Sequence, residues 1–347
     1  MCKVNSIEMS AWTARVSECF EYYQRPFRYL GLFPFIESNG TTKISRLALV
    51  WSIFIGLTVS TFALTYLFLS QREKDLPKIL IIIDKILSIT TATSHILFVT
   101  FLVTYRQTLV SAFQILRRLE RKLSGLNPHA SFTYPALSMS ALILILILSL
   151  FVSPNKNRLM DDAIFLIPTF FIYGTAYLYT RTLILVKHFF THITNSLYIK
   201  KDVNNLDILL DCNDLLINCC DDLNKCFGPS LLSIMTTSFC MLTFNFYMLF
   251  SSKIVDLYAK LVAAVWIIIY TNLVLHVVWA SNSTVKEADS FKNTINRFAF
   301  EGNNEQIKKA MILLSSDKTV IFSACDLFDM DFKMVCSVST FKYYAYI

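Results

Sequence analysis

The chain has 347 residues, of which 54% are hydrophobic and only 16% are charged, and its mean hydropathy is +0.50. Soluble globular domains carry about 25% charged residues, so a pair of soluble domains is excluded. The 29 Phe and 16 Tyr, beside only 7 Gly and 8 Pro, exclude disordered and collagen-like chains. The net charge of +7 is attributed to Lys and Arg beside a membrane, so no nucleic-acid partner is expected. Residues 1–34 hold no uncharged apolar run, so no cleaved signal peptide is expected.

Six apolar runs are long enough to cross a bilayer as helices. A helix needs about 20 apolar residues to cross the hydrocarbon core. Continuous runs, rather than alternating ones, favour helices over a membrane barrel. We therefore expect an all-α polytopic membrane protein with six transmembrane helices. The runs are 47–69, 79–103, 134–152, 163–180, 227–252 (apolar from 229 to 250) and 261–279.

A further apolar stretch, 332–347, follows the six runs. Its 16 residues correspond to about 24 Å of helix, whereas the hydrocarbon core is about 30 Å thick. Lys333 lies at its start, where it can reach the interface, but Lys342 lies well inside, where an ammonium group facing lipid is costly. We therefore expect an incomplete seventh helix.

The distribution of Lys and Arg predicts the orientation. The N-terminal segment and the three long connections carry 22 basic residues, and the three short connections carry 7. The positive-inside rule then places the N-terminus in the cytoplasm. Two glycosylation sequons, at Asn39 and Asn282, lie on the same side, so neither is expected to be glycosylated.

The long connections are expected to form a helical cytoplasmic anchor. In 206–227, apolar residues recur at helical spacing, while acidic residues occupy another face. Similar apolar stripes run through 104–133 and 280–331. These helices either pack together or lie separately in the lipid interface. The acidic residues favour packing, because the inner leaflet of the membrane is anionic.

Two short motifs resemble a known family. One is Leu30-Gly31-Leu32-Phe33-Pro34-Phe35, just before the first run, and the other is 322–332, which reads FSACDLFDMDF. Both resemble segments of insect gustatory receptors, which usually have Gly where this chain has Asp326. The six runs with short outer and long inner connections also fit that family. The motif residues are Gly31, Phe33, Pro34, Phe322, Ser323, Ala324, Cys325, Leu327 and Phe328.

The resemblance implies a seven-span subunit of a ligand-gated, non-selective cation channel in the plasma membrane. It further implies a tetramer, either of this chain or with other gustatory receptor subunits, whose last helices line the pore. The family's last helix usually carries Thr-Tyr and Gln-Phe pairs, which 332–347 lacks, so an atypical or truncated C-terminus is expected. The expected domains are a cytoplasmic N-terminus (1–46), a transmembrane ligand-binding region (47–279) with cytoplasmic helix extensions (104–133 and 181–226), cytoplasmic anchor helices (280–331) and an incomplete final pore helix (332–347).

Ionisable residues inside the second run are candidate functional groups, because such groups are costly in a membrane. Asp84 lies one to two turns from the outer end, and His95 lies near mid-membrane. Asp84 either lines a water-filled vestibule or only reaches the headgroup zone. His95 either binds a ligand or holds a neighbouring helix.

Aromatic residues with polar groups are the main candidates for ligand recognition. Residues four apart share a helix face, and amphipathic rings suit small ligands with an apolar face and a hydroxyl group. Each of these residues also fits plain helix packing. The candidates are Tyr173 and Tyr177 in the fourth run, Phe244 and Tyr247 in the fifth, and Trp266 and Tyr270 in the sixth.

Enzyme, cofactor and metal signatures are not found. Cys212, Cys219, Cys220 and Cys226 match no zinc-ligand spacing and are expected to be reduced thiols in the cytosol. The phosphate-loop, zinc-peptidase, hydrolase and dinucleotide motifs do not occur. The sequence therefore predicts no enzyme activity, no cofactor and no metal.

The leading hypothesis is a gustatory receptor that lies in lipid, binds a small tastant among its second to sixth spans and opens a pore. A non-conducting truncated subunit or null product of the same family is the alternative. A polytopic transporter that uses Asp84 and His95 as a proton relay is a third hypothesis.

Overall fold

The computed structural model of the chain contains three long helices with shorter elements beside them. Each long helix has 45 residues, which corresponds to about 68 Å. The described residues are 35–38, 41–69, scattered helical positions between 82 and 104, 105–123, 156–200, 206–250, 257–301, 319–325, 327 and 329–333.

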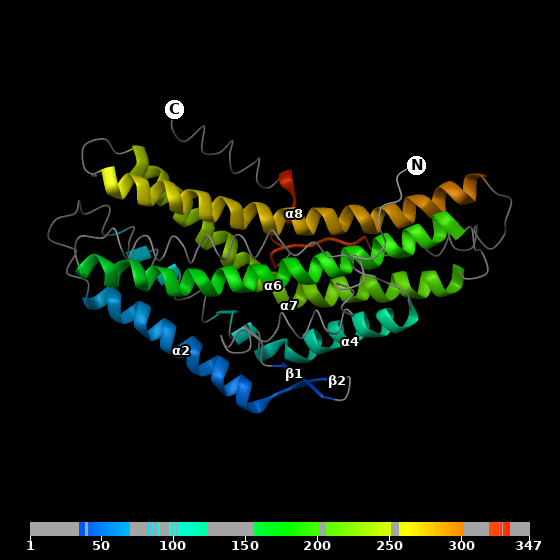
Figure 1. Ribbon diagram of the computed structural model, residues 1–347, viewed down its shortest axis with the longest axis horizontal. Coiled ribbons are helices and arrows are strands. Elements are labelled where there is room, and N and C mark those ends of the chain that lie inside the picture. Colours follow the sequence, from blue (N-terminus) through cyan, green and yellow to red (C-terminus); the bar gives the residue numbers. More distant parts are fainter. Residues whose placement is uncertain are drawn as a thin grey trace, which may run out of the picture.

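The long helices are α6 (Lys156–Lys200), α7 (Leu206–Phe250) and α8 (Leu257–Glu301), and they pack against one another. They run along the longest axis of the molecule (Figure 1). Helix α2 (Arg46–Leu69) packs against α6 along one half of the bundle, and α4 (Arg106–Lys122) packs against α7 along the other half. The described part is thus mainly helical, as the sequence predicts.

A short hairpin precedes α2 and departs from the all-α expectation. Strands β1 (Phe35–Ser38) and β2 (Thr41–Ile44) pair antiparallel, with Phe35 opposite Ile44, and β2 contacts α4. Ser45 then caps α2, because its hydroxyl oxygen accepts a hydrogen bond from the Ala48 amide at 3.3 Å. The Asn-Gly pair between the strands is typical of two-residue hairpin connections, so the sequence does contain a pattern that predicts this hairpin.

The fourth, fifth and sixth apolar runs each form one half of a long helix. The end of the fourth run at 180, the start of the fifth at 227 and the end of the sixth at 279 lie at one level. The hydroxyl oxygens of Tyr179 and Ser281, at the ends of the fourth and sixth runs, are 2.8 Å apart. The Tyr179 ring lies 5.4 Å from the ring of Phe227, where the fifth run begins. The Cys226 thiol donates to the carbonyl oxygen of Tyr105, just after the second run, at 3.7 Å. We call this level the junction.

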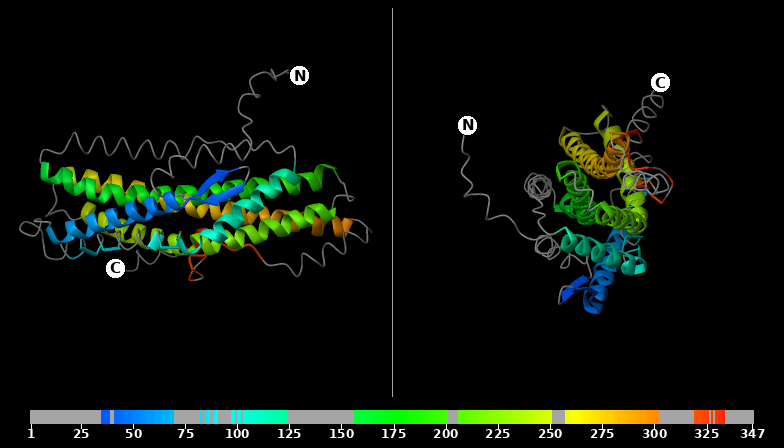
Figure 2. Two further views of the ribbon diagram at one scale, coloured as in Figure 1. Left: turned by 90° about the horizontal axis from the view of Figure 1, so that it is seen from below. Right: turned by 90° about the vertical axis from the view of Figure 1, so that its right-hand side faces the viewer.

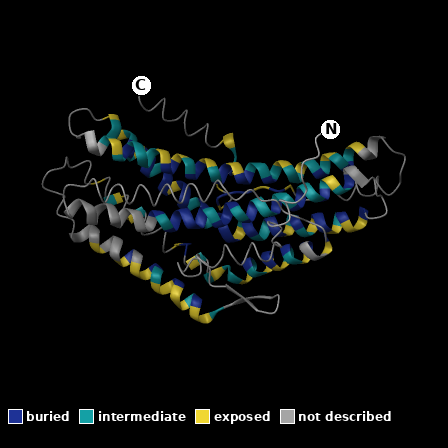
Figure 3. Ribbon diagram, in the orientation of Figure 1, coloured by how far each residue is buried: buried dark blue, intermediate teal, exposed yellow. Residues whose placement is uncertain are grey.

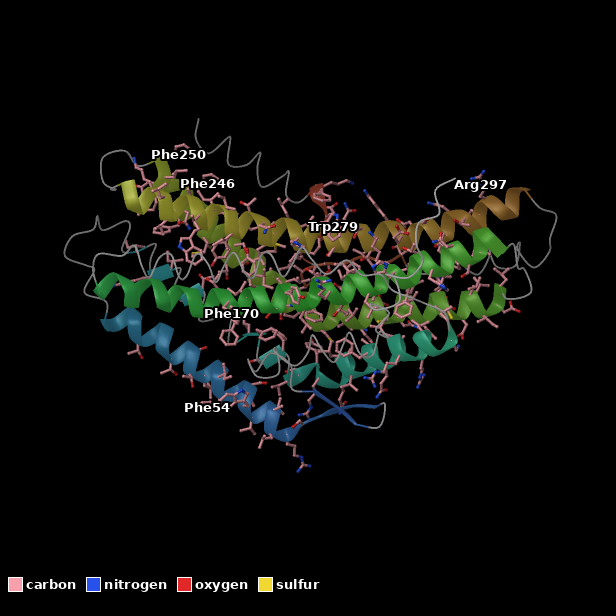
Figure 4. The ribbon with its side chains drawn as sticks, viewed as in Figure 1. Phe54, Phe170, Phe246, Phe250, Trp279 and Arg297 are labelled. Atoms are coloured by element: carbon pink, nitrogen blue, oxygen red, sulfur yellow. The ribbon has the colours of Figure 1, made fainter. Side chains whose placement is uncertain are left out.

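The bundle has different surfaces on the two sides of the junction. We call 47–69, 163–180, 229–250 and 261–279 the apolar half, and 105–123, 181–200, 206–227 and 280–301 the charged half. Exposed large hydrophobic side chains, such as Ile268 at 68% and Phe54 at 58%, cluster in the apolar half. Figure 3 shows exposed positions along α2, and Figure 4 labels Phe54 on that helix. In the charged half, Ile208 is the exposed large hydrophobic residue among those described. A surface of this kind along one half fits lipid contact.

Two described helices are long and apolar enough to cross a membrane by length and composition: Leu206–Phe250 and Lys260–Arg297. The number of six spans therefore remains a prediction, and the third run at 134–152 lies outside the described residues. Helix α7 contains Pro229, which has no amide hydrogen to donate, and the helix changes direction near its middle (Figure 1).

The charged half is held by apolar packing between α4 and α7. The predicted apolar faces of both helices are buried, including Leu116 of α4 and Leu223 of α7. The Cys219 thiol donates to the carbonyl oxygen of Ala112 at 3.6 Å. Lys122 and Asp211 form an ion pair at the exposed edge of this contact.

Four cysteines of α7, namely Cys212, Cys219, Cys220 and Cys226, are buried free thiols. Burial disfavours the thiolate, so it raises the pKa of Cys226 to about 12 and also raises the pKa values of Cys219 and Cys220. These thiols are therefore unreactive packing groups at neutral pH. Among the described residues, no three His, Cys, Asp or Glu side chains are grouped as a metal site.

Candidate functional site

Aromatic and hydroxyl side chains join α6 to α8 in the apolar half. The Tyr173 hydroxyl donates a hydrogen bond to the carbonyl oxygen of Ile269. The hydroxyl oxygens of Thr169 and Tyr270 lie 3.0 Å apart and share a hydrogen bond. Trp266 stacks on Tyr270 with ring centroids 5.8 Å apart. We call these residues the α6–α8 cluster.

The chemistry of the α6–α8 cluster follows from its burial. Tyr173 and Tyr270 are buried, and Trp266 is half-buried. A buried hydroxyl group is costly unless it is hydrogen-bonded, and both phenol groups have partners on the facing helix. The cluster therefore combines aromatic surface with a shared hydroxyl pair, the combination that can orient a small amphipathic molecule.

The other predicted aromatic residues lie elsewhere. Tyr177 follows Tyr173 by one helical turn, and the Arg181 guanidinium lies 5.2 Å from the centre of its ring. Phe244 and Tyr247 come from α7, where Phe244 is half-buried and Tyr247 is 38% exposed. The structure thus brings Tyr173 together with the predicted pair of α8 and directs Tyr177 toward a charged neighbour.

Several predicted residues lie outside the described part of the chain. They comprise both ionisable candidates of the second run and part of the two family motifs: Asp84, His95, Gly31, Phe33, Pro34 and Phe328. Their proposed roles remain predictions.

The second family motif docks at the junction. Phe322 is 2% exposed, and its ring packs edge-on against Tyr179 with centroids 6.3 Å apart. Ser323 and Ala324 are also buried, whereas Cys325 and Leu327 are exposed. The segment that contains these residues lies near the middle of the bundle's length, shown in red in Figure 2.

The backbone of this segment folds back on itself. The Met330 amide donates to the carbonyl oxygen of Phe322 at 2.8 Å, and Ser323 forms an isolated antiparallel bridge with Asp329. Cys325 has a φ of 54°, in the left-handed region that favours glycine. We call residues 319–333 the hook.

Sequence reasoning missed the residues that receive the hook. Asn224 of α7 exchanges two hydrogen bonds with Ser323, and Tyr179 and Ser281 form the adjacent buried pair. Asn224 lies among the acidic and polar residues of its segment, so no local pattern distinguishes it from solvent-exposed neighbours. Tyr179 belongs to an aromatic-rich run in which its partners were not predictable.

Comparisons with known proteins agree with this fold. The family described as "7tm Chemosensory receptor" matches residues 21–341. Among solved structures, the insect olfactory receptor OR5 from Machilis hrabei has a TM-score of 0.63 and 11% sequence identity, over 95% of this chain and 97% of that chain. At this identity the likeness shows a shared fold. A comparison with curated proteins found no match.

Proposed function

Since the chain belongs to the 7tm chemosensory receptor family, we propose that it is a gustatory receptor in the plasma membrane. It acts as a subunit of a chemosensory, ligand-gated cation channel that detects small tastants. The family match supports the receptor class and a membrane location. The choice of taste over smell rests on the two motifs that resemble gustatory receptors.

The tastant binds at the α6–α8 cluster, and the observation that carries this assignment is the buried hydroxyl pair of Thr169 and Tyr270 beside a stacked indole. A ligand hydroxyl group competes for this pair while an apolar ligand face stacks on Trp266. To open the channel, the tastant must bind the open state more tightly than the closed state. Asp84, His95, Tyr177, Phe244 and Tyr247 are further proposed ligand contacts.

We further propose that the charged half lies in the cytoplasm, where it joins four subunits, either identical or from other gustatory receptors. Support comes from the excess of basic residues on that side and from the common level of the apolar run ends. Glycosylation at Asn282, in the charged half, would contradict this orientation.

Whole-cell recording tests the proposal. Cells that express the full chain are exposed to sucrose, fructose, quinine, an amino-acid mixture and carbon dioxide, and cation current is measured. We expect one probe class to evoke current, and Trp266→Ala to raise its half-maximal concentration by about tenfold or more, equivalent to 1.4 kcal/mol. Trp279→Ala is the matched control, because Trp279 lies on the same helix at 46% exposure, away from the cluster.

The alternatives give different results. A non-conducting subunit gives current only when a second receptor subunit is co-expressed. A transporter gives proton-coupled uptake without channel noise. An equal potency shift in both tryptophan variants would remove the α6–α8 cluster from the ligand site.

A further inference from the structure

The hook is held on α7 by one amide side chain. The Asn224 carboxamide oxygen accepts a hydrogen bond from the Ser323 backbone amide at 3.0 Å, and its nitrogen donates to the Ser323 hydroxyl at 3.3 Å. A carboxamide both donates and accepts, so it can satisfy a backbone amide and a hydroxyl at once. Truncating Asn224 would remove both bonds and leave a part-buried backbone amide of the hook without this partner.

Aromatic packing connects the same hook to all three long helices. Phe322 packs against Tyr179 of α6, whose ring also contacts Phe227 of α7. The Tyr179 hydroxyl shares a hydrogen bond with Ser281 of α8. Tyr179 is fully buried, so a shift of α6 against α8 must change its position or its hydrogen bond. Such a shift would therefore reach Phe322 directly.

The fit between hook and α7 is close, and the hook backbone is strained. A Cβ atom placed on Gly228 would lie 3.3 Å from the Cys325 nitrogen and 3.5 Å from the Ser323 oxygen. Cys325 holds its positive φ although it has a side chain. A backbone in this region persists where surrounding contacts hold it in place. Release of the hook would relieve this strain, which makes the docked state easier to leave.

From these contacts we propose that Asn224 and Tyr179 form a releasable clamp on the hook. Asn224 holds the hook, and Tyr179 couples the relative position of α6 and α8 to the position of the hook. Both are positioning residues, because they contact the hook and not the ligand. This inference rests on the proposed function for its role in gating, since the hook leads into 332–347, and ligand binding at the α6–α8 cluster would move the same two helices.

Hydrogen exchange on the full chain in lipid nanodiscs tests the clamp without any ligand. In Asn224→Ala, we expect backbone amides of 319–333 to exchange about tenfold faster or more, because two hydrogen bonds are lost. Asn224→Asp keeps the acceptor for the Ser323 amide and should give an intermediate rate. Asn218→Ala is the matched control, since Asn218 is exposed on the same helix. Equal hook exchange in Asn224→Ala and wild type would overturn the clamp.

Tyr179→Phe tests the coupling, because it keeps the aromatic contacts and removes only the hydroxyl group. We expect hook exchange to rise in Tyr179→Phe, to rise equally in Ser281→Ala, and to rise no further in the double variant. Unchanged hook exchange in both single variants would overturn the role of Tyr179. General unfolding is excluded if α6 and α8 peptides keep their protection, whereas loss of that protection in Tyr179→Phe would also count against a specific clamp.

A recording experiment separates this inference from the proposed function. In cells that respond to a tastant, Asn224→Ala should change basal or maximal current, while Trp266→Ala changes the half-maximal concentration. If no current is found but the exchange results hold, the clamp stands and the channel proposal fails. If current and ligand response in Asn224→Ala match those of Asn218→Ala, the gating role of the clamp is wrong.

Discussion

The apolar and charged halves of the bundle, although formed by the same three long helices, expose different kinds of side chain. In the apolar half, Thr169 and Tyr270 pair their hydroxyl groups inside, and Ile268 faces outward. In the charged half, Leu119 and Leu223 are fully buried, and the acidic residues of α7 lie mainly on its outer face. The hydrophobic effect drives the packing of apolar side chains in water, but it does not drive helices together in lipid. In the proposed arrangement, hydrogen bonds and close packing therefore hold the apolar half.

Both kinds of interaction, apolar packing and hydrogen bonding between helices, occur at the junction. Tyr179 combines an apolar ring contact with Phe227 and a hydroxyl bond to Ser281 in one side chain. The hook docks at this level through an aromatic ring and an amide–hydroxyl pair. A segment docked between two differently stabilised halves is well placed to respond to movement in either one.

The largest effect is expected from truncating the core of the charged half. Leu223→Ala truncates a side chain of α7 that is fully buried against the neighbouring helices. The lost burial and the residual cavity should reduce the free energy of unfolding by about 2–5 kcal/mol. Thermal unfolding followed by size-exclusion chromatography measures the change. Ile208→Ala, at a residue 50% exposed on the same helix, is the control and should have little effect.

A charged side chain on the exposed face should be tolerated in the charged half but not in the apolar half. Ile268→Asp places a carboxylate on the exposed face of the apolar half, where insertion of Asp at a helix centre costs about 2.5–3.5 kcal/mol. Ile208→Asp makes the same substitution in the charged half and should be tolerated. Membrane-inserted protein is quantified by carbonate extraction. Equal insertion of the two variants would mean that the apolar half does not face lipid.

Alkaline pH should weaken the charged half. Burial raises the pKa of the Cys220 thiol, so this thiol stays neutral in the folded state. In the unfolded chain the same thiol ionises above about pH 9. The stabilisation is therefore complete below pH 9 and is lost as pH rises toward the folded pKa. At one pH unit above its ordinary pKa, each buried thiol of this kind should reduce the free energy of unfolding by about 1.4 kcal/mol. The pH dependence of unfolding should be shallower in Cys220→Ala than in wild type, and an unchanged slope would refute this assignment.

The smallest effect is expected at the edge of the charged half. Lys122 and Asp211 form an ion pair, but both side chains are well exposed, at 43% and 57%. Water and salt screen such a pair, so Lys122→Gln should leave the unfolding temperature close to that of wild type. A large loss would show that the pair is shielded by another part of the chain or by a partner subunit.

The sequence predicted much of the local structure but few of the site contacts. Helical periodicity identified the buried faces of α4 and of the first half of α7, where Leu116 and Leu223 are buried. It missed the hairpin before α2, because charge counting treated that segment only as a cytoplasmic terminus. It grouped Tyr173 with Tyr177 by spacing, whereas the structure joins Tyr173 to the α8 backbone beside Tyr270.

The sequence by itself determined the apolar runs, the buried faces of α4 and of the first half of α7, and the family of the chain. These properties depend on residues within a few turns of one another, and hydrophobicity and helical period record them directly. Only the tertiary structure decided that Tyr179 meets Ser281, 102 residues away, and that Asn224 meets Ser323, 99 residues away. Such pairs are set by the relative height of packed helices, which no local pattern encodes.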